Sequence, residues 1–210
     1  MQRALEAALE SVRAGSLGIG AAVADPDGDV IARGRNRLHE TDRGDDAVAG
    51  TSLAHAEVNA LSKLRFRVHE DRGLVLHTTL QPCLQCLGAI RLSPVQRVVI
   101  LAPDPLWLGV EQVRTLSPFI GARWPVIETL PASAWSVFAL LSPTRHALDH
   151  PRISAPWRAA LPRTSELAAA LDPATLDGPL ADAVAEWWSD LEACVPEVEE
   201  LAVQARRHQA

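Results

Sequence analysis

The sequence has few cysteines and no long apolar run. Its 210 residues include only three cysteines, too few for the disulfide framework that stabilises many small secreted domains. No apolar run approaches the roughly 20 residues of a membrane-spanning helix. Residues 1–6 open an amphipathic helix that contains an acid, which is not the pattern of a signal peptide. We therefore expect a cytoplasmic protein without membrane association.

Clustered basic residues are also missing. The formal net charge is −6, and the arginines are scattered, with no basic run longer than residues 65–67. A protein that grips a phosphate backbone usually carries a cationic face. The charge pattern therefore weighs against a tRNA or DNA ligand, although it leaves room for a local basic patch.

What the sequence does contain is a set of three metal-ligating side chains with a carboxylate beside them. His55 and Glu57 stand two residues apart, and Cys83 and Cys86 follow later in the chain as a C-x-x-C pair. A catalytic zinc ion takes three protein ligands and keeps a fourth position for water. In the first turn of the helix expected after Pro82, both thiols share one face, and the free backbone amides favour the thiolate form that binds metal.

A C-x-x-C pair alone also fits a redox site or one half of a zinc ribbon. The chain has no second C-x-x-C to complete a ribbon, since Cys194 is the only other cysteine. A redox site would not explain His55 and Glu57 at the start of an upstream helix. The combined pattern therefore predicts a zinc site with an open position.

Apolar periodicity divides residues 1–145 into alternating strands and helices. We predict helices at residues 2–13, 53–64, 84–92 and 132–141, and strands at residues 18–25, 30–33, 74–78, 97–101 and 124–128. The first two strands form a hairpin, and the strand–helix–strand unit around Cys83 implies parallel neighbours. Residues 38–52 form a polar loop that is long enough to be functional.

After residue 145 the composition changes, because prolines separate short helical pieces. We predict a domain at residues 1–145 and a Pro-rich helical extension at residues 146–210, which packs on the domain or on a partner subunit. One helix at residues 180–195 would either add stability or cover the mouth of the pocket. Trp187 and Trp188 would point about 100° apart on it, so one would face the core and the other its edge.

Residues 17–141 resemble the cytidine-deaminase superfamily, and within it the branch of cytosine, guanine and tRNA adenosine deaminases. The matching elements are residues 20–21, 34–37, 55–60, 78–90 and 104–109. The resemblance implies a three-layer α/β/α sandwich around a five-stranded mixed sheet, commonly assembled as a homodimer.

The resemblance also implies roles for individual residues. His55, Cys83 and Cys86 would bind Zn²⁺. Glu57 would move protons, and Asn36 would hydrogen-bond the bound base. Asn36 has an alternative as a turn residue, because asparagine commonly forms local bonds in turns. The metal ligands are then complete, so we expect the remaining histidines to be ordinary surface or core residues: His39, His69, His77, His146 and His150.

Two departures from the family pattern lie beside the expected pocket. Gln81 stands where many relatives have Glu before the Pro-Cys pair, and the spacing from Asn36 to His55 is longer than is usual in cytosine and guanine deaminases. Either departure could accompany an unusual substrate.

We expect a zinc-dependent aminohydrolase that releases ammonia from a small nucleobase or nucleoside. One alternative is a tRNA adenosine deaminase, which the acidic charge disfavours. The other is a catalytically silent zinc-binding scaffold that associates with proteins through its tail. Glu57 argues against the scaffold, because a structural zinc ion requires no free carboxylate. The sequence does not select among the bases.

Overall fold

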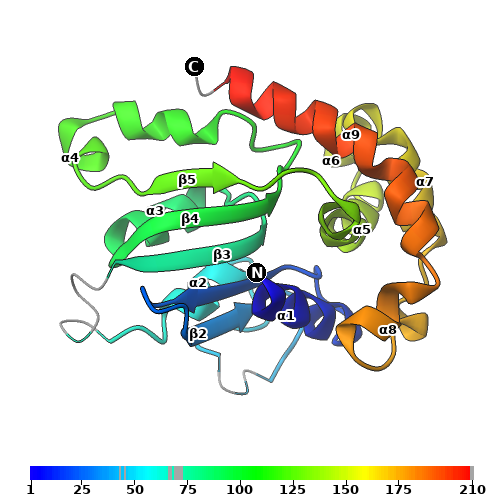
Figure 1. Ribbon diagram of the computed structural model, residues 1–210, viewed down its shortest axis with the longest axis horizontal. Helices are drawn as coiled ribbons and strands as arrows, with labels where there is room; N and C mark the ends of the chain where they lie inside the picture. The colour runs from blue at the N-terminus through cyan, green and yellow to red at the C-terminus, as the bar shows by residue number, and fades with distance from the viewer. Residues whose placement is uncertain (43, 45, 66–67, 69–72, 209–210) are drawn as a thin grey trace.

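The fold is built on one mixed β-sheet. The computed structural model describes residues 1–42, 44, 46–65, 68 and 73–208, and within them five strands pair in the order β2-β1-β3-β4-β5 (Figure 1). The strands are β1 (Gly20–Ala24), β2 (Val30–Arg35), β3 (Leu74–Leu80), β4 (Val95–Ala102) and β5 (Val126–Thr129). β1 is antiparallel to β2 and β3, whereas β3, β4 and β5 are parallel. The predicted mixed sheet is confirmed.

Helices cover both faces of the sheet, as the predicted sandwich requires. α1 (Gln2–Arg13) and α5 (Ala134–Leu148) share one hydrophobic cluster, and α2 (Ala56–Leu61) and α3 (Leu84–Leu92) share the other. Two glycines allow close packing. A Cβ atom at Gly20 would collide with the backbone of α1, and one at Gly34 would collide with that of α2.

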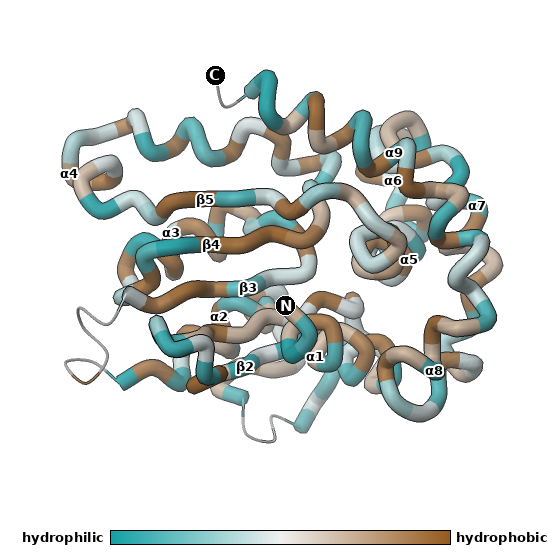
Figure 2. The backbone as a smooth tube through the Cα atoms, in the orientation of Figure 1, coloured by the Kyte–Doolittle hydropathy of each residue, from teal (hydrophilic) through white to brown (hydrophobic). Residues whose placement is uncertain are grey.

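The core lies between these layers, around the central strands. Figure 2 shows long hydrophobic stretches along β3 and β4, and these strands supply side chains that are at most 1% exposed: Leu74, Leu76, Val98 and Ile100. Such continuous apolar runs are typical of parallel strands buried on both faces. After β4 the chain forms a 3₁₀ helix, η1 (Val110–Thr115), and the short α4 (Pro118–Gly121) before it enters β5.

The C-terminal helices wrap around α5 (Figure 1). They are α6 (Pro151–Ala160), α7 (Pro162–Ala170), the 3₁₀ turn η2 (Pro173–Thr175), α8 (Leu180–Ala185) and α9 (Trp188–Arg207). Glu197 on α9 accepts hydrogen bonds from the backbone amides of Arg163 and Thr164 at 2.7 and 3.0 Å, which caps the start of α7. Arg13 donates to the carbonyl of Leu176 at 2.6 Å. The extension therefore shares a core with the domain.

Several element boundaries differ from the prediction. The helix predicted at residues 53–64 is shortened to α2, because His55 adopts an extended backbone as its N-cap, and Leu53 is 55% exposed. α5 continues through Pro143 to Leu148. The division predicted after residue 145 therefore falls inside a helix, although the two-part organisation itself stays a prediction.

The helix predicted at residues 180–195 is two helices. The helical conformation is interrupted at residues 186–187, and α9 then continues past Pro196 to Arg207. The buried face of α9 offsets the backbone hydrogen bond that Pro196 cannot make. Trp187 and Trp188 are both partly buried against the same cluster, so the prediction of one core and one edge tryptophan is wrong. No helix in the described residues is both long and apolar enough to cross a membrane.

Candidate metal centre and substrate pocket

The predicted metal ligands meet at the starts of two helices on the same face of the sheet. His55 is the N-cap of α2, Cys83 is the N-cap of α3, and Cys86 lies in the first turn of α3. α2 packs directly on β2 at Gly34, and α3 follows β3 after only three residues, 81–83. The predicted ligands are thus brought together by helices anchored to neighbouring parts of the sheet.

The donor atoms have the separations that zinc requires. Nδ1 of His55 lies 3.5 Å from the Cys83 sulfur and 3.3 Å from the Cys86 sulfur, and the two sulfurs are 3.7 Å apart. Tetrahedral zinc, with bonds of about 2.3 Å to sulfur and about 2.0 Å to nitrogen, holds its ligands about 3.5 to 3.8 Å apart. The donor set therefore fits Zn²⁺ through three protein ligands. Within the described residues, the group of three or more His, Cys, Asp or Glu side chains that could hold one metal ion is His55, Cys83 and Cys86. Their ligand atoms all lie within 4.8 Å of one another.

The electrostatics of the ligands favour metal binding. Contact with Cys86 and with the His55 ring lowers the pKa of Cys83 to about 4, against the opposing effect of burial. Cys83 is therefore a thiolate at neutral pH, which is the form that binds metal. The hydrogen bond with Cys83 and burial both raise the pKa of Cys86 in the metal-free protein, so metal binding would displace the Cys86 proton.

Glu57 stands beside the ligands without being one of the three. Its Oε2 accepts from the Cys86 thiol at 3.2 Å, and its Oε1 accepts from the Thr78 hydroxyl at 3.1 Å. The Glu57 side chain is buried, and burial raises its pKa. A higher pKa makes the carboxylate a better proton acceptor, and the same group can then release the proton to a substrate. The fixed orientation suits Glu57 to the proton transfer that the sequence predicted for it.

These residues open into a cavity of about 220 Å³, whose lining includes Asn36. Oδ1 of Asn36 accepts from the backbone amide of Leu38 at 3.0 Å, which is the local turn bond considered in the sequence analysis. The amide nitrogen of Asn36 can donate to a ligand while Oδ1 keeps this turn bond. The geometry accommodates both roles of Asn36, and its contact with a substrate stays a prediction.

Another part of the lining comes from α5 and α6. The sequence analysis named the helix at residues 180–195, and not α6, as a cover for the pocket, and residues 180–195 contribute nothing to this lining. His146, Ile153 and Trp157 all line the cavity, and Trp157 is only 2% exposed. His146 is partly buried, and its ring contacts those of His39 and His150 with centroids 5.5 and 4.2 Å away. No local pattern could reveal this wall, because its residues lie roughly 60 to 100 positions from the predicted ligands and carry no motif. His69 lies outside the described residues.

The segment after β4 closes another side. Asp104, Leu106 and Trp107 line the cavity, and burial raises the pKa of Asp104 to about 7. Gln81 connects this segment to the zinc ligands, because it precedes Pro82-Cys83 and its side chain bonds to three residues of the segment. The sequence analysis noted both Gln81 and the stretch 104–109 but did not predict that they touch.

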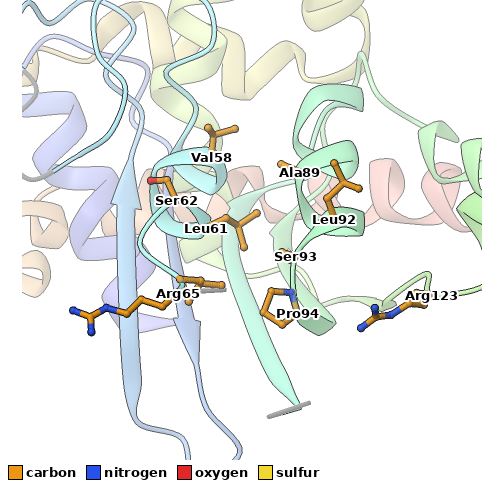
Figure 3. Close-up of a pocket in the computed structure, with 10 residues that line it drawn as sticks. Val58, Leu61, Ser62, Arg65, Ala89, Leu92, Ser93, Pro94 and Arg123 are labelled. Atoms are coloured by element: carbon orange, nitrogen blue, oxygen red, sulfur yellow. The ribbon is translucent and has the colours of Figure 1, made fainter. Parts of the chain in front are cut away.

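A second hollow lies between α2 and α3 on the outer side of the molecule. It encloses about 360 Å³, and Figure 3 shows Leu61 of α2 pointing towards α3, which carries Ala89 and Leu92. Among the described residues that line it there is no His, Cys, Asp or Glu. The predicted metal ligands and Glu57 instead line the cavity beside His55.

Comparison with known proteins gives the family. The family model described as the cytidine and deoxycytidylate deaminase zinc-binding region matches residues 1–102. The tRNA-specific adenosine deaminase of Streptococcus pyogenes serotype M1 is 31% identical over 117 residues, which are 54% of this chain and 62% of that protein. This chain belongs to the cytidine-deaminase superfamily. The family and the site geometry together confirm zinc as the predicted cofactor.

Other superfamily members support the same assignment. Guanine deaminase of Bacillus subtilis (strain 168) is 35% identical over 92 residues, 43% of this chain and 54% of that protein. A solved structure from a study of A-to-I editing by tRNA:A34 deaminases aligns with a TM-score of 0.54 at 29% identity. That alignment spans 66% of this chain and 96% of the other. The chain spans about three-fifths of the length of the S. pyogenes relative.

Proposed function

We propose that this superfamily member is a zinc-dependent hydrolytic deaminase of a small nucleobase or nucleoside. The observation that carries the proposal is the buried Glu57 carboxylate, 3.2 Å from the zinc-ligand sulfur of Cys86 and in the lining of the same cavity. A site that held zinc only for structure would need neither the carboxylate nor the cavity.

The net reaction adds water to an amine-bearing ring carbon and releases ammonia. Zinc held by His55, Cys83 and Cys86 would lower the pKa of water and so supply a nucleophile near neutral pH. Glu57 would take a proton from the attacking water and deliver it to the ring nitrogen, as the new C–O bond forms. It would then carry the second proton of the water to the leaving amine, as the C–N bond breaks. Its hydrogen bond with Thr78 holds Glu57 on this short path.

Enclosure of the cavity supports a small substrate. Its volume is about 220 Å³, and its lining includes the apolar side chains of Ile153 and Trp157 from α6. A flat heteroaromatic ring suits such a space, because apolar walls bind its faces while a few polar groups fix its edges. The net charge of −6 points the same way, since binding of a phosphate backbone relies on cationic side chains.

A tRNA adenosine deaminase is the second candidate. It is favoured by the identity with the S. pyogenes enzyme and by the structural match to a protein from a study of tRNA:A34 deaminases. Under this alternative, the cavity would receive one base flipped out of an RNA loop. Homodimer formation and a cytoplasmic location also stay predictions.

One assay tests both candidates. Zinc-loaded protein is incubated with cytosine, cytidine, guanine, guanosine, adenine, adenosine, an aminotriazine and unmodified tRNA, and ammonia and inosine are measured. We expect ammonia from at least one small compound, and none from the Glu57→Gln variant at equal zinc content. Inosine formed in tRNA, with salt-sensitive binding and no turnover of small compounds, would establish the second candidate instead. Equal turnover by Glu57→Gln would overturn the proton-transfer role.

A further inference from the structure

The side chain of Gln81 uses both ends of its amide on one segment of the chain. Its Oε1 accepts from the backbone amide of Asp104 at 3.1 Å. Its Nε2 donates to the carbonyl of Trp107 at 3.0 Å and to Oε1 of Glu111 at 3.1 Å. Gln81 is 5% exposed. One buried amide thus bonds to the beginning, the middle and the end of residues 104–111.

Residues 104–107 of this segment form a wall of the cavity, whereas Gln81 is close in sequence to the predicted metal ligand Cys83. Asp104 and Trp107 line the cavity, as does Gln81 itself. Only Pro82 separates Gln81 from the ligand Cys83, and the Gln81 backbone amide donates to the carbonyl of Ala102 at 2.9 Å. The position of the wall relative to the metal centre therefore depends on the contacts that Gln81 makes.

Because the carboxylate of Glu111 needs a hydrogen-bond donor, an amide suits position 81 better than a second carboxylate. Glu111 is 6% exposed, and its Oε1 accepts from Gln81. An ionised carboxylate only accepts hydrogen bonds, so its partner must donate. A glutamate at position 81 would place two buried carboxylates in contact and would also oppose the Trp107 carbonyl. Such contacts are costly in a buried site. The departure from the family pattern at position 81 is therefore matched by an acid at position 111.

We propose that Gln81 and Glu111 form a matched pair that positions the wall at residues 104–107 over the bound base and thereby sets substrate specificity. Gln81 is a positioning residue, because it acts on the base through Asp104 and Trp107. The proposal rests on the proposed deaminase function for its effect on specificity. Its structural part, that the pair holds the segment, stands independently of any substrate.

Three variants of nearly equal size test the pair: Gln81→Glu, Glu111→Gln and the double variant. Glu111→Gln is the control, because Gln81 can still donate to the amide oxygen at position 111. Gln81→Glu should lower kcat/KM about tenfold or more, mainly through KM, at unchanged zinc content. The double variant should regain about fivefold or more over Gln81→Glu, because an amide at position 111 then donates to the carboxylate at position 81. The substrate is the best compound of the ammonia panel.

Two further measurements distinguish a positioning role of Gln81 from a general loss of folded structure. Lower pH should selectively improve Gln81→Glu relative to the other proteins, because a protonated carboxyl at position 81 can donate to Glu111. The ratio of kcat/KM for the two best compounds should also shift in that variant alone. An effect of Gln81→Glu that is equal with Glu or Gln at position 111 would overturn the pair, as would kinetics unchanged from the parent protein.

Hydrogen exchange by mass spectrometry tests the structural part without a substrate. Backbone amides in residues 103–111 should exchange faster in Gln81→Glu and return towards the parent rate in the double variant. If the parent protein releases no ammonia from any compound, the proposed function fails, and the exchange rates alone decide whether the pair holds the segment. If the parent is active but exchange and specificity do not depend on the pair, the inference fails while the proposed function stands.

Discussion

The hydroxyl of Thr78 lies between two acceptors, 3.1 Å from Oε1 of Glu57 and 3.0 Å from the carbonyl of Leu80. A hydroxyl has one proton to donate. It can donate to an ionised Glu57, or donate to the Leu80 carbonyl while it accepts from a protonated Glu57. Thr78 is fully buried, so its bonds are shielded from bulk solvent. Its hydroxyl therefore suits both protonation states that a proton-carrying carboxylate passes through.

Replacement of this hydroxyl should slow turnover without loss of metal. Thr78→Val keeps the size and shape of the side chain, and none of the three zinc ligands bonds to the hydroxyl. We expect kcat to fall about tenfold, because Glu57 without this hydrogen bond is held less firmly in the geometry for proton transfer. Steady-state kinetics at equal zinc content measures the effect. The Thr78→Ser variant retains the hydroxyl and should stay close to the parent, and a Thr78→Val enzyme of full activity would refute the role.

The metal should contribute to stability as well as chemistry. Cys83→Ser and His55→Ala each remove one of three ligands, so we expect loss of most bound zinc and a lower unfolding temperature, because metal binding and folding are coupled. Cys194 provides the control, since it is a free cysteine buried in the other hydrophobic cluster. Cys194→Ala should keep about one zinc ion per chain. Metal analysis and thermal unfolding, with and without a chelator, give the comparison.

The amide of Asn36 can be tested apart from its turn bond. Asn36→Asp keeps an oxygen that accepts from Leu38 but removes the only donor of the side chain, whereas Asn36→Ala removes both. We expect Asn36→Asp to raise KM about tenfold at unchanged zinc content, because the substrate pocket loses the hydrogen bond that the Asn36 amide would donate to the base. If only Asn36→Ala changes the kinetics, the side chain serves the turn and not the substrate.

How far the sequence predicted the molecule depends on whether a feature is local. The grouping of His55, Cys83 and Cys86 was predictable because a zinc site is recognisable from its residue types and their spacing in the chain. The strands were predictable because they contain apolar runs such as residues 98–101. The break at residues 186–187 was not predictable, because the apolar spacing continues across it and only the packing of α8 and α9 decides where a helix ends.

The cavity wall shows the same limit more strongly. Trp157 lies about a hundred positions from His55, and its place in the cavity follows from the packing of α6 on α5. The Gln81 network likewise joins residues far apart in the chain. Such contacts depend on the tertiary structure, and a single sequence carries no periodic signal for them.

His77 should make stability sensitive to acid. Burial, with smaller effects from the N-terminal ammonium and Arg97, lowers the pKa of His77 in the folded protein, whereas the unfolded chain has a pKa of about 6.5. The unfolded chain therefore binds more protons, so stability rises with pH. The contribution is complete above about pH 6.5 and is lost as pH falls towards the lowered folded pKa.

A neutral replacement at position 77 isolates this effect. His77→Gln should lose less stability than the parent between neutral pH and about pH 5, because the glutamine gains no charge. Chemical unfolding is followed in excess zinc, so that loss of metal contributes equally to both proteins. Parallel pH profiles for parent and variant would show that His77 is not the group responsible.

Trp157 should be needed for the selectivity of the cavity as well as for the core. Trp157→Ala removes a large buried side chain, and such changes cost about 3 to 5 kcal/mol. It also opens the cavity wall, so we expect larger ring substituents to be accepted, with a lower kcat/KM for the preferred compound. Leu161→Ala is the matched control, because Leu161 is fully buried in the same cluster but does not line the cavity. The control should lose stability and keep the substrate preference.

Truncation after residue 150 tests the whole extension. It would remove α6 to α9 and expose the apolar face of α5 that they cover, with about half of one hydrophobic cluster. We therefore expect insoluble protein, because an exposed apolar surface of this kind promotes aggregation. A soluble, zinc-loaded product without turnover would instead show that the extension acts mainly as a wall of the pocket. Full activity in a soluble product would refute both roles, since neither the core nor the cavity would then need the α6 contacts of Ile153 and Trp157.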